Sequence, residues 1–217
     1  MQILNRTLHS QTVDRMKWFS LIVFTSLPFG LWSQFDYSLA TQLDSMKQED
    51  QRWRNLAVAV QNGEVDSITL EQARHHMRRV DSFNHLLLVE LFERHGFIGF
   101  DKAGTNGSHD FWLLMQHQDR YTEFQEEVLA AMETEVDKGN ADAQNYAYLT
   151  DRVLVNSGRP QLFGTQMELN EEQTSFVPRT CEEPEKLNER RAGMGLPPIE
   201  DYVNMMNEHY HGSLKKD

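Results

Sequence analysis

Long stretches without a helix-breaking residue constrain the fold of this chain most strongly. Residues 36–62 contain neither Gly nor Pro, and Gly63 follows them. Residues 67–95 are also free of both residue types, and Gly96 ends that stretch. Helices commonly end at Gly, which adopts the left-handed conformation without steric cost. Both stretches are therefore predicted to be long helices, the second of them capped by Ser67 or Thr69.

The rest of the chain predicts shorter elements. The Gly-rich residues 96–110 are expected to form a loop, and a helix is expected from residue 111 to about residue 138, where Gly139-Asn140 breaks it. Another helix is predicted over residues 141–156 and a last short one near Tyr202. In between, QLFGTQMEL and TSFVPR resemble two short strands around a polar turn. We expect a mainly α fold, a helical domain with a small β-hairpin near residues 161–178; an α+β fold is the alternative.

A short apolar run near the N-terminus is typical of a signal peptide. From Met16 the chain reads MKWFSLIVFTSLPFGLWSQ, with Lys17 as the positive residue and Ser33 as a small residue at the cleavage point. The run is too short and too interrupted for a membrane-spanning helix of about 20 residues. The alternative is a buried N-terminal helix. We predict a signal peptide over residues 1–33, with Met16 as an alternative start, followed by one helical domain over residues 34–217.

This pattern predicts an exported protein, periplasmic or extracellular, with no transmembrane span in the mature chain. Its 33 acidic and 21 basic residues give a net charge of −12, a surface that repels phosphate backbones, so no nucleic-acid partner is expected. Cys181 is the only cysteine, which excludes an internal disulfide. The sequence has no GxSxG, HExxH, P-loop or dinucleotide motif, and no cofactor or metal is expected.

Four polar residues stand out by their helical positions. In the helix expected over residues 111–138, His117 falls on the apolar stripe and Asp119 on the other side. Asp151 and Arg152 both lie among apolar neighbours, and a buried charge requires a partner. His117 is either a core histidine or an acid–base group. Asp151 and Arg152 either form a buried salt-bridge network or act as a tuned carboxylate and an anion-binding guanidinium.

A loop of amides and hydroxyls follows the helix of residues 141–156. In GRPQLFGTQ, Gln161, Thr165 and Gln166 surround Gly164, which permits a close approach of the backbone to another group. Such side chains both donate and accept hydrogen bonds, so the loop is suited to a polar ligand. The alternative is a hairpin tied to the helices by side-chain hydrogen bonds.

The order of several short motifs resembles a bacterial family known only as domain of unknown function 6624. The chain carries DQRWR at residues 50–54, Asp81 with Asn84, HGFIGFDKAG, QHQD, YLTDR, GRPQLFGTQ and ERRAGMGLPPIEDY in the family's order, over about residues 36–202. Phe163 stands where the family pattern has Tyr, so no chemistry is assigned there. The resemblance brings no reaction with it. It implies these pattern residues: His117, Asp119, Asp151, Arg152, Gln161, Thr165, Gln166, and Arg190 or Arg191.

Two functions from different classes are compatible with these residues. One is an exported, cofactor-independent hydrolase or lyase, with His117 as general acid or base and Asp151 orienting it. The other is a cell-envelope binding or interaction module, in which the same polar residues form a structural network. The partner would be a small molecule, a peptide or a glycan. The residues expected to bind substrate are Asp119, Arg152, Gln161, Thr165, Gln166, Arg190 and Arg191.

Overall fold

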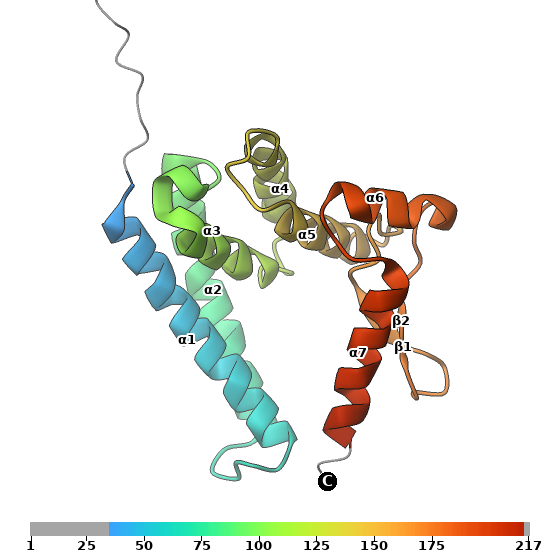
Figure 1. The fold of residues 1–217 in the computed structure, drawn as a ribbon. Helices are drawn as coiled ribbons and strands as arrows, with labels where there is room; N and C mark the ends of the chain where they lie inside the picture. Colours follow the sequence, from blue (N-terminus) through green and yellow to red (C-terminus); the bar gives the residue numbers. More distant parts are fainter. Residues whose placement is uncertain (1–34, 215–217) are drawn as a thin grey trace, which may run out of the picture. The chain divides into compact units, whose positions relative to one another are not determined.

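A computed structural model describes residues 35–214 of the 217-residue chain, and the side chains of residues 35–209. The predicted signal peptide, residues 1–33, lies outside the described residues. The described part contains seven α-helices, one short 3-10 helix and a two-stranded antiparallel hairpin. The predicted fold, mainly α with a small β-hairpin, is therefore confirmed (Figure 1). No helix in this part of the chain is both long enough and apolar enough to cross a membrane.

The two longest helices begin and end close to their predicted limits. Helix α1 spans Tyr37–Gln61, and the side chain of Asp36 caps its first turn. Helix α2 spans Leu70–His95, and it opens with a reciprocal capping box between Thr69 and Gln72. Gly96, with a φ of 64°, ends α2.

The predicted loop over the Gly-rich residues 96–110 is confirmed only for residues 96–99, and it is wrong for residues 100–110, which are helical. Helix α3 spans Phe100–Gln116 and carries a kink at Gly104, where φ is 68°. Its first turn is capped by a distant residue: Phe100 N donates to the Asn140 backbone oxygen at 2.9 Å, and Asp101 N donates to Asn140 Oδ1 at 2.9 Å. The sequence pattern could not include this cap, because it comes from a residue about 40 positions later.

The single helix predicted over residues 111–138 is also wrong, because the chain leaves the helix after Gln116. Helix α4, Thr122–Asp137, begins only after a turn over residues 117–121. Two side-chain amides account for the break. Gln125 Nε2 donates to the Met115 carbonyl at 2.8 Å, and Gln118 Nε2 donates to the Leu114 carbonyl at 3.4 Å. Both carbonyls also accept from the backbone three residues on, Leu114 from His117 N at 3.2 Å and Met115 from Gln118 N at 3.1 Å, so α3 closes in a tight turn instead of continuing.

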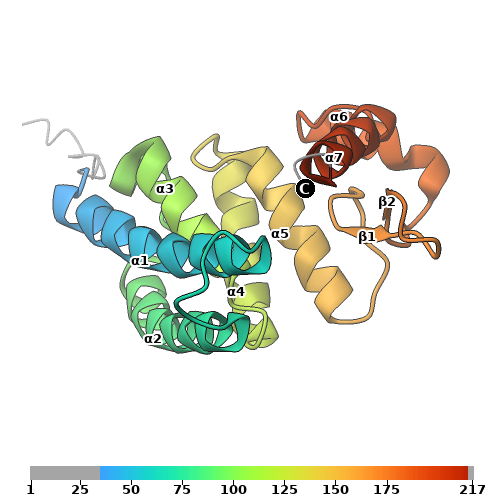
Figure 2. The same ribbon diagram turned by 90° about the horizontal axis from the view of Figure 1, so that it is seen from below.

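The main core lies among the first five helices. Helix α1 packs against both α2 and α3, while α5, Ala143–Asn156, packs against α4 and α3 (Figures 1 and 2). On α1 the buried residues are spaced by three, four or seven positions, as one face of an amphipathic helix requires. They are Leu39, Leu43, Met46, Asp50 and Ala57. One member of this stripe, Asp50, is a carboxylate.

The C-terminal part is built around the hairpin. Strand β1, Met167–Leu169, pairs antiparallel with β2, Phe176–Pro178, so the predicted hairpin is present. The 3-10 helix η1, Pro184–Lys186, leads into α6, Leu187–Gly193, and α7, Ile199–Leu214, ends the described chain. A small second core joins this part to α5 through three buried residues, Ala147, Phe163 and Leu196.

Candidate functional site

The buried carboxylate of Asp50 is the centre of a polar cluster. Its side chain is 1% exposed, and it lies in the middle of α1. Arg54 Nε, one helical turn later, lies 3.0 Å from Asp50 Oδ1, and Gln51 Nε2 donates to Oδ2 at 2.9 Å. His117 Nδ1 lies 2.9 Å from the same Oδ2. Three side chains thus converge on one carboxylate that has almost no access to water.

His117 reaches Asp50 because the chain turns after α3. The imidazole belongs to the turn between α3 and α4, and its side chain is 14% exposed, so it contacts the buried carboxylate and still reaches the surface. Although Nδ1 is 2.9 Å from Asp50 Oδ2, its N–H is not well aligned with that oxygen. The contact is therefore best described as an electrostatic pairing that small rotations of the ring would strengthen.

A second carboxylate is joined to the cluster through Arg54. Its Nη2 donates to Asp81 Oδ1 of α2 at 2.5 Å, so the guanidinium bridges Asp50 and Asp81. Burial raises the pKa of Asp81, Asp50 and Asp119 add to the rise, and Arg54 and His117 oppose it. For Asp50, burial likewise acts to raise the pKa, but contacts with His117 and Arg54 outweigh it and lower the pKa below its usual value. The two carboxylates thus have pKa values displaced in opposite directions.

The turn that carries His117 also carries Asp119, which forms an exposed ion pair with Arg152. Asp119 accepts two hydrogen bonds from Arg152 of α5, from Nε and from Nη2, both at 2.7 Å. Asn156 Nδ2 adds a third at 2.9 Å. Burial acts to raise the pKa of Asp119, but the bonds from Arg152 and Asn156 lower it overall. This forked pair ties the turn that carries His117 to α5.

Asp151 occupies a different environment from its neighbour Arg152. Its carboxylate is completely buried and accepts from the backbone N–H groups of Leu162, Phe163 and Thr165, at 2.7, 2.9 and 2.8 Å. The Thr165 hydroxyl donates to Asp151 Oδ2 at 2.9 Å. Burial raises the pKa of Asp151, and these hydrogen bonds oppose the rise. The carboxylate holds the residue 162–165 loop against α5.

The remaining candidate residues of the GRPQLFGTQ loop belong to the same network. Gln161 is fully buried, and its Nε2 donates to the carbonyls of Gln166 and Arg179 at 3.0 and 2.8 Å. Arg190 Nε donates to the Leu162 carbonyl at 2.7 Å. Arg191, 1% exposed, donates to the carbonyls of Pro197 and Phe163. Gln161, Thr165 and Arg191 are enclosed, whereas Arg190 of α6 is partly exposed, and these side chains are satisfied by one another or by the backbone.

The candidate residues thus divide between two places. His117 and Asp119 lie on one turn, and Arg152 reaches Asp119. Asp151 and the residues of its loop form the other group. The carboxylate that contacts His117 is Asp50, whereas Asp151 contacts the loop. Asp50, Arg54 and Asp81 were absent from the predicted site, although all three stand in the motifs that carry the resemblance. The sequence did contain one indication of Asp50: its carboxylate stands at the next position of the apolar repeat formed by Leu43 and Met46.

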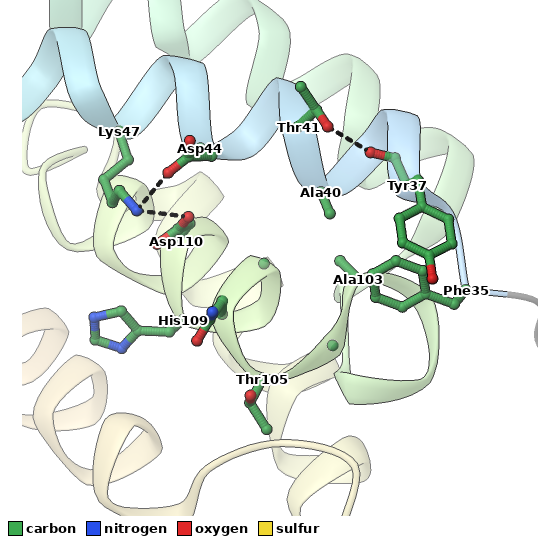
Figure 3. Close-up of a pocket in the computed structure, with 13 residues that line it drawn as sticks. Phe35, Tyr37, Ala40, Thr41, Asp44, Lys47, Ala103, Thr105, His109 and Asp110 are labelled. Carbon is green, nitrogen blue, oxygen red and sulfur yellow. Dashed lines mark hydrogen bonds and ion pairs between the residues drawn. The ribbon is translucent and has the colours of Figure 1, made fainter.

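Two hollows lie on either side of α1. The larger, a cavity of about 770 Å³, lies between α1 and α3. Figure 3 shows Phe35 and Tyr37 at one end and Lys47 at the other, where Lys47 Nζ lies 2.8 Å from Asp44 and 3.0 Å from Asp110. The charged groups here are paired with one another. The second, a groove of about 610 Å³, lies between α1 and α2. Within residues 35–209, no group of three or more His, Cys, Asp or Glu side chains is placed to hold a metal ion.

Together these features define a helical domain that carries a half-buried carboxylate–imidazole–guanidinium cluster and a separately buried carboxylate-centred loop. A family model described as a family of unknown function (DUF6624) matches residues 38–215. The chain therefore belongs to the DUF6624 family, as the motifs predicted. No curated protein and no solved structure matched the chain.

Proposed function

We propose that the protein is a hydrolase or lyase that uses His117 as its general acid or base. The observation that carries the proposal is the pairing of the His117 imidazole with Asp50, a carboxylate buried to 1% exposure, while the ring itself still reaches the surface. A buried carboxylate beside one ring nitrogen holds the imidazole in one orientation, with the other ring nitrogen free to exchange a proton with a substrate. Asp50 takes the orienting role that the sequence suggested for Asp151.

The opposite pKa displacements of Asp50 and Asp81 support the same proposal. Two carboxylates in one cluster, one with a lowered and one with a raised pKa, can hold different protonation states at the same pH. Asp50 remains the anion beside His117. Asp81, with a side chain that is 19% exposed, is the group from which a second proton could be donated. Arg152, which the sequence suggested for substrate binding, is held by Asp119 in the forked pair, so we assign it the role of fixing the turn that carries His117.

The test compares three variants on chromogenic substrates. Wild type is screened with 4-nitrophenyl esters, phosphates and glycosides, and any turnover is then measured in His117→Ala, Asp50→Asn and His109→Ala. Loss of a general acid or base lowers kcat by about 10² to 10⁴. His117→Ala should show this loss, and Asp50→Asn a smaller one. His109 is exposed on α3 and its ring contacts Asn145 and Trp112 instead of Asp50, so it is the matched control and should retain activity. Equal activity in His117→Ala and His109→Ala would refute the assignment.

A second candidate function is a binding or interaction module. The enclosed, mutually paired side chains around Asp151 support it, because such a network fixes a loop rather than presenting reactive groups. Under this proposal the chain recognises a small molecule, a peptide or a glycan. A wild-type protein that turns over none of the substrates in the panel would favour it.

We further propose that either function is performed outside the cytoplasm. The support is the N-terminal sequence alone, in which Lys17 precedes a short apolar run and Ser33 follows it. N-terminal sequencing of the protein recovered from cell envelope and culture medium would test this. A chain that begins near residue 34 supports export, whereas one that retains residues 1–33 in the cytoplasm contradicts it.

A further inference from the structure

The groove between α1 and α2 differs in character from the polar cluster. It has a volume of about 610 Å³ and lies along the seam of the two longest helices. Its lining includes three aromatic rings and one aliphatic thioether. They belong to Trp53, His76, Phe83 and Met46. None of the four belongs to the Asp50–His117 cluster, so the groove is a separate feature of the same two helices.

Flat rings form the walls of this groove. Trp53 and His76 stack with their ring centroids 4.0 Å apart and their planes only 6° from parallel, so each ring covers one face of the other and the pair joins the two helices at the groove. Phe83, about two helical turns after His76 along α2, is 62% exposed. An exposed phenyl ring beside an aromatic surface is apolar area that an apolar ligand can cover.

A buried hydrogen-bond donor lies at the floor of the groove. Asn84 lines the groove, is only 3% exposed, and its Nδ2 has no hydrogen-bond partner in the described part of the chain. Leaving a buried amide donor unpaired costs free energy, and native proteins rarely do so. The donor therefore indicates the position of an acceptor that the protein itself does not supply.

The rim of the groove carries an unpaired positive charge. Arg79 is exposed and has no carboxylate partner within residues 35–209. The acidic residue on the opposite rim, Glu49, accepts from Trp53 Nε1 at 2.7 Å and pairs with Arg52 at 3.2 Å. Its charge is thereby partly neutralised, which leaves the Arg79 guanidinium to attract an anion at this end of the groove.

We propose that this groove binds a small molecule with a flat apolar body and a carboxylate head. The body would lie on Trp53 and against Phe83, and a carboxylate oxygen would accept the hydrogen bond from Asn84 Nδ2. Arg79 would attract the charge of the head from the rim. The site is independent of the reaction proposed at His117, because none of its residues contributes to that cluster.

The test uses 4-phenylbutyrate as the probe and 4-phenylbutylamine as its counterpart without an acceptor. Binding to the full chain is measured by titration calorimetry. Wild type should bind the acid and not the amine. Asn84→Leu keeps the approximate volume and removes the donor, so affinity for the acid should fall about tenfold. Its melting temperature should be unchanged or higher, because an unpaired buried donor is lost.

Two surface variants keep the proposal testable if Asn84→Leu folds poorly. Phe83→Ala removes an exposed ring from the groove and should weaken binding of 4-phenylbutyrate by about tenfold. Leu86→Ala, 67% exposed on the same helix but outside the groove, is the matched control and should bind as wild type does. The proposal is overturned if wild type fails to bind the acid, if the amine binds equally well, or if Phe83→Ala and Leu86→Ala bind it alike.

Discussion

Replacing Asp151 by Asn tests the interpretation of the buried loop network most directly. The carboxylate accepts four hydrogen bonds of 2.7 to 2.9 Å, three from backbone N–H groups and one from the Thr165 hydroxyl. Asn has nearly the same shape but only one accepting oxygen. In Asp151→Asn, the remaining oxygen would take the place of Oδ1 and accept from Leu162 and Phe163. The amide nitrogen would then take the place of Oδ2 and face two donors, the N–H and the hydroxyl of Thr165.

The magnitude follows from counting the donors left without an acceptor. Each unsatisfied buried donor costs about 1 to 3 kcal/mol. Two of them, the Thr165 N–H and hydroxyl, give an expected loss of about 3 kcal/mol in the free energy of unfolding at neutral pH. The raised pKa of Asp151 reduces this figure, because burying the anion already costs the wild type stability.

Urea unfolding at pH 7, followed by far-ultraviolet circular dichroism, measures the loss. Asp119→Asn is the control, since its side chain is 44% exposed and exposed pairs contribute about 1 kcal/mol or less. Amide hydrogen exchange adds a local measure: residues 162, 163 and 165 should lose protection selectively in Asp151→Asn. A loss below about 1 kcal/mol, equal to that of Asp119→Asn, would refute the view that this carboxylate anchors the loop.

Two further predictions concern charge and packing. Asp50→Asn should destabilise the protein by about 2 to 3 kcal/mol at pH 7, because it breaks a buried pairing with Arg54 and His117. The lowered pKa of Asp50 makes its contribution complete above the ordinary value of 3.8 and lost as the pH falls below it, so the wild-type and variant stabilities should converge as the pH is lowered below 3.8 in denaturant titrations. A difference that stays constant as the pH falls would contradict a lowered pKa of Asp50. Gly99→Ala would place Cβ 2.7 Å from the Asn140 backbone oxygen and should lower the melting temperature, at a cost of about 1 to 3 kcal/mol. Gly193→Ala, whose Cβ meets nothing within 4 Å, should leave it unchanged or raise it.

Helix ends that depend on neighbouring residues were predictable from the sequence. Asp36 and the Thr69–Gln72 capping box supply their own hydrogen bonds within three residues, and Gly96 ends α2 by its own conformational freedom. The hairpin was predictable for the same reason, since its two strands and turn lie within a dozen residues. These elements need no information from elsewhere in the fold.

Two predictions were wrong, the loop over residues 100–110 and the single helix over residues 111–138. In both places a distant residue influences the local conformation. Asn140 caps α3 from about 40 residues away, which turns a Gly-rich stretch into a helix. Gln125 Nε2 donates to the Met115 carbonyl across the turn at which α3 ends, just before His117. This stretch contains no Gly or Pro that would indicate a helix end in the sequence. Local periodicity reports intrinsic preference, and tertiary hydrogen bonds of this kind override it.

The sequence by itself determined the helical class, the family and two charged residues, Asp151 and Arg152, that need a partner. Only the tertiary structure decided which partner each one has. Asp151 and Arg152 are adjacent in sequence, but they point in different directions from α5, one to the residue 162–165 loop and the other to Asp119. Asp50 meets His117 across 67 positions of the chain. Successive helix residues diverge by about 100°, so the pairing of buried charges is fixed by how helices pack and not by their order along the chain.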